Sequence, residues 1–149
     1  MNEKSRKLHI SLFAGYCIVM LWLLFGRTGY VEGTPYLEQM KVNLVPLRTL
    51  KLFIRLLSHH RPQLVLSATI NLVGNIVMFI PLGVFLPLVS SKFQKLWKTL
   101  LCAALIISIV EFLQLLTLVG ICDIDDLILN LIGAALGFTI YRYIKKPAQ

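Results

Sequence analysis

The sequence has little charge and few acidic residues. Charged residues make up 15% of the 149 residues, whereas hydrophobic residues make up 57%. A soluble domain of this size cannot hide so much apolar surface, so the composition excludes one and predicts an integral membrane protein. The 15 Lys and Arg outnumber the 7 Asp and Glu. We interpret this excess as basic loops that contact anionic lipid headgroups, and we expect no nucleic-acid partner.

The sequence also lacks the common catalytic and metal-binding motifs. No pair among its three cysteines, Cys17, Cys102 and Cys122, has metal-type spacing, so neither a disulfide framework nor a zinc site is expected. There is no Ser–His or Cys–His constellation, no phosphate-cradling loop and no paired histidine ligand. We therefore expect no cofactor and no bound metal.

Four apolar runs are long enough to cross a membrane as helices, which takes about 20 residues each. They cover residues 8–25, 65–89, 96–119 and 127–144. The predicted fold is thus a single all-α membrane domain, 1–149, with four transmembrane helices. Pro81 is expected to bend the second helix and to free the carbonyl one turn before it.

Basic residues predict the orientation of these helices. They gather at the N-terminus, between the second and third spans, and at the C-terminus, whereas the loop between the third and fourth spans has three acids and no base. The three basic regions lie on one side of a four-helix protein, so this pattern predicts that both termini are cytoplasmic.

The long first loop contains an amphipathic segment at about residues 46–58. Its polar positions Arg48, Lys51, Arg55 and Ser58 recur at helical spacing, and apolar residues fill the other face. Pro46 suits a first helical turn. A helix with a basic stripe is suited to the membrane interface, where it either packs across the ends of the spans or binds a ligand.

Polar residues recur on one face of each of the last three spans. They are Asn71 and Asn75, then Glu111 and Gln114, then Asp123, Asp126 and Asn130. Because successive spans run in opposite directions, all seven fall in the same half of the membrane. Each would cost several kcal/mol facing lipid, so we expect them to meet in a polar cavity in the outer half, under the first loop.

Several of these residues also have simpler roles. Asparagines and Gln114 can be hydrogen-bonding links between helices, and Asp125, which points away from the polar face, is expected to be a helix cap or a solvated rim residue. Gly133 and Gly137 form a G-x-x-x-G pair suited to close helix packing. Glu111 is different, because a carboxyl at its depth must be paired or protonated.

Four blocks in order, "NLVPL", "NLVGNIVMFIPLG", "EFLQ" and "DIDDLILNLIGAALG", resemble the VanZ-like family of small bacterial membrane proteins. The resemblance runs from about Asn43 to Gly137. It implies a four-helix protein of the bacterial cytoplasmic membrane, in a family whose named member confers low-level resistance to the glycopeptide teicoplanin. The matching positions are Asn43, Pro46, Asn71, Gly74, Asn75, Phe79, Pro81, Gly83, Glu111, Gln114, Asp123, Asp126, Asn130, Gly133 and Gly137.

The sequence departs from the family at one place. Family members often carry an arginine shortly before the first aspartate of the last block, where this chain has "TLVGIC". If that arginine pairs with an acid, then Arg48 or Arg27 must replace it, or the site is altered.

Three functions are compatible with these patterns. The first is a non-enzymatic envelope protein whose polar cavity, with Arg48, binds or masks an anionic lipid-linked wall precursor or headgroup and so lowers teicoplanin susceptibility. The second is a membrane enzyme that uses Glu and Asp for acid–base or metal chemistry on such a substrate. The third is a transporter of a small anion or lipid, which at four spans would have to form a homodimer.

Overall fold

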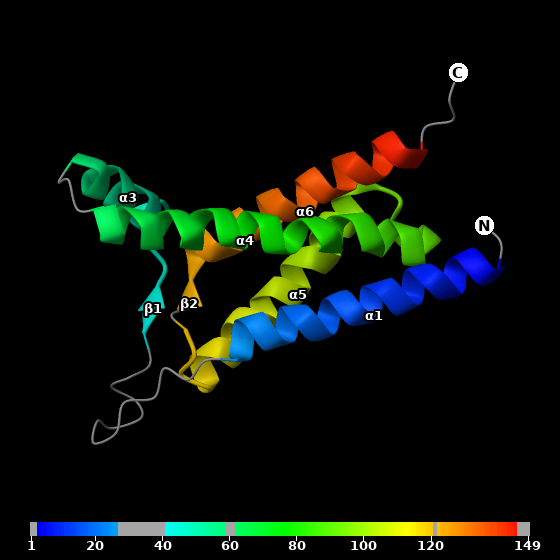
Figure 1. Ribbon diagram of the computed structural model, residues 1–149, viewed down its shortest axis with the longest axis horizontal. Coiled ribbons are helices and arrows are strands. Elements are labelled where there is room, and N and C mark those ends of the chain that lie inside the picture. Colours follow the sequence, from blue (N-terminus) through cyan, green and yellow to red (C-terminus); the bar gives the residue numbers. More distant parts are fainter. Residues whose placement is uncertain (1–2, 27–40, 59–61, 121, 146–149) are drawn as a thin grey trace.

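Four long antiparallel helices dominate the computed structural model, which describes residues 3–26, 41–58, 62–120 and 122–145 (Figure 1). They are α1 (Glu3–Phe25), α4 (Pro62–Val89), α5 (Leu96–Leu116) and α6 (Ile124–Lys145), and all four are long and apolar enough to span a membrane. The shorter elements are β1 (Val42–Asn43), α3 (Arg48–Ser58), the 3-10 turn η1 (Ser91–Phe93) and β2 (Cys122–Asp123). The predicted all-α fold with four spans and one amphipathic helix is confirmed.

The outer surface of the long helices is apolar. Trp22 of α1, Ile70 of α4 and Leu105 of α5 are each at least 60% exposed. Side chains of this kind are stable at a protein surface only when they face hydrocarbon or another apolar surface. The exposed belt therefore fits a chain surrounded by lipid.

Four span boundaries differ from the sequence-based expectation by three residues or more. The helices α1 and α4 begin earlier than expected, at Glu3 and Pro62, and the other two differences, at the end of α5 and the start of α6, have local causes. The third span ends at Leu116 because Leu118, with φ of 55°, turns the chain into the left-handed region. Val119 N donates to Gln114 O at 3.1 Å and Leu118 N to Leu115 O at 3.3 Å, which is the Schellman pattern of a helix end. The fourth span begins at Ile124, three residues earlier than expected, so Asp125 and Asp126 belong to its first turn.

A seam of glycines brings α4 and α6 into backbone contact. A Cβ at Gly133 would overlap the Ile76 carbonyl, one at Gly137 the Ile80 carbonyl, and one at Gly83 the Ala134 carbonyl. The expected close packing at Gly133 and Gly137 therefore occurs, and its partner is α4.

Pro81 lies inside α4, which continues without a break to Val89 (Figure 1). Because Pro81 has no N–H, the carbonyl of Val77 lacks its usual helical donor. The Tyr16 hydroxyl of α1 donates to the neighbouring carbonyl of Met78 at 2.9 Å. The proline region is thus where α1 is linked to α4.

The bundle is divided into an apolar half and a polar half. The buried apolar cluster contains Phe79, Leu82, Leu86, Ala103, Ile107 and Ala134, with Met20 from α1. The polar residues of α4, α5 and α6 lie toward the opposite end, where α1 and α5 end, α4 and α6 begin, and β1, β2 and α3 are found (Figure 1). The polar half of the fold is the candidate site.

The glycine seam makes a prediction about stability. Gly133→Ala and Gly137→Ala each force a methyl group into the α4 backbone and are expected to destabilise the fold by about 1–3 kcal/mol. Gly74→Ala is the matched control on α4, because a Cβ added there would meet nothing within 4 Å, and its stability should change by no more than about 1 kcal/mol. Thermal unfolding of the purified variants in detergent measures these changes in stability. Equal melting temperatures for all three variants would contradict the prediction that Gly133 and Gly137 are required for close packing of α6 against α4.

Candidate functional site

Asp123 begins α6 and connects it to the first loop. Its Oδ1 accepts from Asp125 N at 2.9 Å and from the side-chain amide of Asn43 at 3.0 Å, and its Oδ2 accepts from the Thr49 hydroxyl at 2.7 Å. Alongside, β1 and β2 form a short parallel pair in which Asn43 lies opposite Asp123. Asp123 is therefore the N-cap of α6 and at the same time holds the start of α3.

Asp125 caps a helix to which it does not belong. Its carboxylate accepts from the backbone N–H groups of Leu47 and Thr49, the latter at 2.7 Å, at the N-terminus of α3. Only 3% of Asp125 is exposed. The expectation that Asp125 is the cap of its own helix or a solvated rim residue is therefore wrong: Asp123 is that cap, and Asp125 is buried against α3.

The approach to α3 is a tight turn rather than a first helical turn. Arg48 N lies 3.4 Å from Val45 O, with Pro46 and Leu47 between them, and Leu47 has a φ of 62°. Pro followed by a left-handed residue is typical of a type II turn, in which glycine usually takes the second position. The helix therefore starts at Arg48, two residues later than expected, and the bond from Leu47 N to Asp125 helps to hold the strained residue.

The predicted polar residues meet in one cavity of about 510 Å³. Seven of the eight predicted site residues line it: Asn71, Asn75, Glu111, Gln114, Asp123, Asp126 and Asn130. Apolar residues of α1 and α5 and the loop residues Val119 and Gly120 complete the wall, and Thr49 enters from α3. Of the described residues that line the cavity, three are acids and none is Lys or Arg. We call it the acidic cavity.

Two of the lining amides link helices. Asn75 donates to Asp126 Oδ1 and so joins α4 to α6. Gln114 donates to Leu24 O at 3.1 Å, a carbonyl in the last turn of α1 that has no partner within its own helix. Asn71 is exposed at the edge of the cavity.

Two buried acceptors in the acidic cavity have no hydrogen-bond partner among the described residues. They are Glu111 Oε2 and Asn130 Oδ1. Glu111 is 7% exposed and Asn130 is 3% exposed. Leaving a buried acceptor unsatisfied costs about 1–3 kcal/mol, and more for a charged group, so these atoms are places where a hydrogen-bond donor is favoured.

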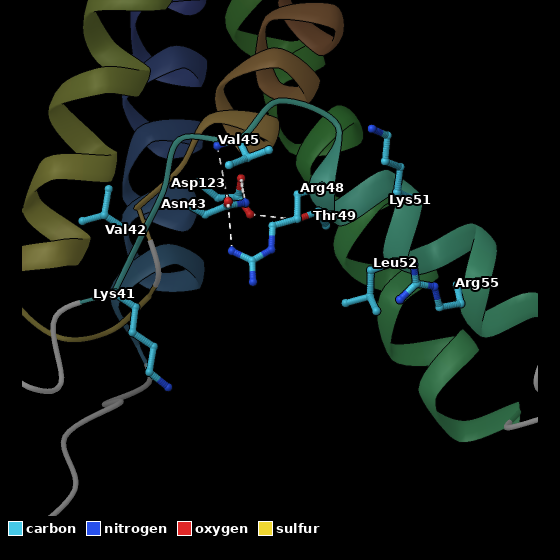
Figure 2. A pocket seen from close by; sticks show the side chains of 10 residues that line it. All are labelled: Lys41, Val42, Asn43, Val45, Arg48, Thr49, Lys51, Leu52, Arg55 and Asp123. Atoms are coloured by element: carbon cyan, nitrogen blue, oxygen red, sulfur yellow. Dashed lines mark hydrogen bonds between the residues drawn. The ribbon is translucent and has the colours of Figure 1, made fainter.

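A second pocket of about 780 Å³ adjoins the acidic cavity and has the opposite charge (Figure 2). Four bases line it: Lys41 before β1, and Arg48, Lys51 and Arg55 along α3. Arg48 points into this pocket and lies 3.5 Å from Asn43 Oδ1. Thr49 and Asp123 line both compartments. We call this second compartment the basic pocket.

Arg48 is therefore not among the residues that line the acidic cavity, in contrast to the expectation that it joins the acids there. It lies beside Asn43 in the basic pocket, next to Asp123. Arg27, the other candidate replacement for the family arginine, lies outside the described residues. Where the structure describes the chain, no group of three or more His, Cys, Asp or Glu is arranged to hold a metal ion.

Thr49 and Lys41 line the site but were not predicted as site residues from the sequence. Thr49 reaches Asp123 across 74 positions of sequence, and a polar residue in the first turn of an amphipathic helix is normally just part of its polar face. Lys41 is placed by β1, whose two residues are too few to produce an alternating pattern. Neither residue carries a local signal that distinguishes it.

The acidic character of the site also affects Cys122, which lies in β2 outside the spans. Burial raises the pKa of the Cys122 thiol, and the charges of Glu111 and Asp123 raise it further. The thiol is therefore kept in its neutral, less reactive form near neutral pH.

The fold and the site together define a small multi-pass membrane protein with a polar site at one end of its bundle. A family model described as VanZ/LLP1 matches residues 13–145. The chain belongs to this family, and the match includes most of α1, which the resemblance in sequence did not cover. No curated protein and no solved structure matches the chain.

The cap at α3 can be tested by removing one acceptor. Asp125→Asn places an amide NH2 against the N–H groups of Leu47 and Thr49, so it should destabilise the docking of α3 by about 1–3 kcal/mol. Because α3 contains Lys51 and Arg55, its release should accelerate tryptic cleavage there in detergent. Thr139→Ala is the control, since that exposed hydroxyl bonds only to Ala135 of its own helix. Unchanged cleavage in Asp125→Asn would show that the carboxylate does not hold α3.

Proposed function

We propose that this VanZ-family protein is a non-enzymatic envelope protein that binds the anionic headgroup of a membrane lipid or lipid-linked wall precursor. The observation that carries the proposal is the basic pocket, in which four bases surround a space of about 780 Å³. Lys and Arg donate charge-assisted hydrogen bonds to phosphate oxygens, and Arg does so in a two-pronged geometry.

The position of α3 supports a lipid as the source of that anion. Ile54 and Leu57 of α3 are each at least half exposed, while Arg48, Lys51 and Arg55 border the basic pocket. A helix with an exposed apolar side and a basic side is suited to the boundary between headgroups and hydrocarbon. A phosphate at the depth of the headgroups would lie beside these bases.

The charges of the two compartments favour the basic pocket, rather than the acidic cavity, as the site of the anion. Glu111, Asp123 and Asp126 line the cavity without a neighbouring Lys or Arg among the described lining residues. Like charges a few ångströms apart in a partly buried site repel by several kcal/mol. The anion-binding role expected for the polar cavity therefore moves to the adjoining compartment.

A non-catalytic role agrees with how the aspartates are used. Asp123 accepts three hydrogen bonds and Asp125 two, and all of these hold helix ends or the first loop. A carboxylate so engaged is poorly placed to exchange a proton with a substrate.

We further propose that the site faces the outer side of the cytoplasmic membrane, with both termini on the cytoplasmic side. The first and last described residues, Glu3 and Lys145, lie at the end of the bundle opposite α3 (Figure 1). Lys92 and Lys95, between α4 and α5, belong to the same end. Short basic segments on one side support a cytoplasmic assignment for that side.

Binding of an anionic lipid in nanodiscs tests the proposal directly. The double variant Arg48→Gln/Lys51→Gln is expected to bind phosphatidylglycerol in nanodiscs at least tenfold more weakly, because each base near a headgroup contributes about 1 kcal/mol. Lys92→Gln/Lys95→Gln, at the opposite end, is the matched control. Native mass spectrometry counts the retained lipids, and raised salt should reduce the difference. Equal loss in both double variants would mean that the basic pocket has no special role.

The link to glycopeptides is tested in cells. Expression of the wild-type chain in a teicoplanin-sensitive bacterium is expected to raise the minimal inhibitory concentration of teicoplanin, and Arg48→Ala should abolish that increase while Lys92→Ala retains it. Membrane levels of each variant are compared by immunoblot. If Arg48→Ala protects as well as the wild type at an equal protein level, then teicoplanin resistance does not depend on the basic pocket.

A further inference from the structure

The acidic cavity has no base among the described residues that line it. Three carboxylates line it, and none of the described lining residues is Lys or Arg. Burying a carboxylate costs several kcal/mol unless it is paired or protonated. The two atoms without partners, Glu111 Oε2 and Asn130 Oδ1, come from different helices that meet at this cavity. A ligand that brings hydrogen-bond donors and positive charge would satisfy both.

The acceptor set indicates which kind of cation fits. Glu111 offers its unpaired Oε2 from α5, and Asn130 offers its unpaired Oδ1 from α6. Asp126, four residues before Asn130 on the same face of α6, also lines the cavity, and its Oδ1 accepts from Asn75. A primary ammonium group has three N–H donors and no acceptor, so it can bond to an oxygen from each of these residues. A quaternary ammonium group has the charge but no N–H.

The neighbouring compartment indicates what the ammonium belongs to. Thr49 and Asp123 line both the acidic cavity and the basic pocket, so the two compartments share a border. A headgroup that occupied both compartments would have to span this border, where the Thr49 hydroxyl donates to Asp123 Oδ2 at 2.7 Å. The anionic end would lie among Arg48 and Lys51, and the cationic end beside Glu111.

We propose that the acidic cavity binds the primary ammonium group of the same amphiphile whose phosphate lies in the basic pocket. The ligand class is thus a lipid whose headgroup carries both a phosphate and a primary amine. This inference rests on the proposed function, because the phosphate is placed by the basic pocket. Two sources share this chemistry: an aminophospholipid, and a lipid-linked wall precursor that carries a free amine.

The test compares headgroups that differ only in their nitrogen. Full-length protein in nanodiscs is offered phosphatidylethanolamine or phosphatidylcholine, which carry the same phosphate and net charge. We expect at least tenfold tighter binding of phosphatidylethanolamine by the wild type. Glu111→Gln, which keeps the side-chain shape, should reduce this preference to less than threefold, and Asn130→Ala, acting from the other helix, should reduce it as well. Glu3→Gln, at the exposed Glu3–Lys7 pair, is the control and should keep the preference.

A second pair of ligands distinguishes the two sources. A lipid-linked precursor with a free side-chain amine is compared with its N-acetylated form. A preference for the free amine that Glu111→Gln removes identifies the precursor as a ligand, and a preference confined to phosphatidylethanolamine identifies the phospholipid.

The outcomes separate this inference from the proposed function. Two results would reject the ammonium site while retaining the phosphate site in the basic pocket. In the first, Arg48→Gln/Lys51→Gln weakens lipid binding, but the wild type does not prefer lipids with a primary amine. In the second, the preference for the amine persists in Glu111→Gln and Asn130→Ala. If the double variant changes no lipid affinity, the proposed function fails, and the ammonium inference that depends on it fails as well. The melting temperatures of Glu111→Gln and Asn130→Ala are measured as well. Values within a few degrees of the wild type show that a lost preference for the amine is not caused by unfolding.

Discussion

The site depends on one interaction, the capping of α3 by a carboxylate from α6. Asp125 accepts the N–H groups of Leu47 and Thr49, and the adjacent Asp123 accepts the Thr49 hydroxyl and the Asn43 amide. These bonds place an interfacial helix across the end of the bundle. That placement closes the acidic cavity with Thr49 and sets Arg48 and Lys51 at the border of a separate basic pocket. Without it, α3 would still contact α4, but its bases would lose their fixed place beside Asp123.

How much of this could be predicted from the sequence depends on the range of the interactions. The spans follow from runs of apolar residues, and the convergence of Asn75, Glu111 and Asp126 follows from helical periodicity and antiparallel order, so both could be predicted. The role of Asp125 could not, because its partners lie 76 and 78 positions away and an acid in a first turn normally stabilises its own helix. The early end of α5 was missed because leucine at position 118 gives no sign of the left-handed turn that glycine would have indicated.

The division of charge between the two compartments changes how the polar residues are understood. A single cavity that contained both the acids and Arg48 would be largely self-neutralised. The structure instead keeps the bases on α3 in one compartment and the free Glu111 and Asn130 oxygens in the other, with Asp123 between them. Such a separation leaves an excess of bases among the described residues on one side and of acids on the other, which is the arrangement expected of a site for a molecule that carries both charges.

The glycine seam also determines when this site can come into existence during synthesis. Gly83 of α4 packs against α6, which follows α4 and α5 in the chain, and Asn75 of α4 bonds to Asp126 of the same helix. Until α6 has been inserted, α4 and α5 must hold Asn75 and Glu111 in the membrane without that partner. The polar half can therefore assemble only after α6 has been inserted, because α6 completes the set of helices that line the acidic cavity.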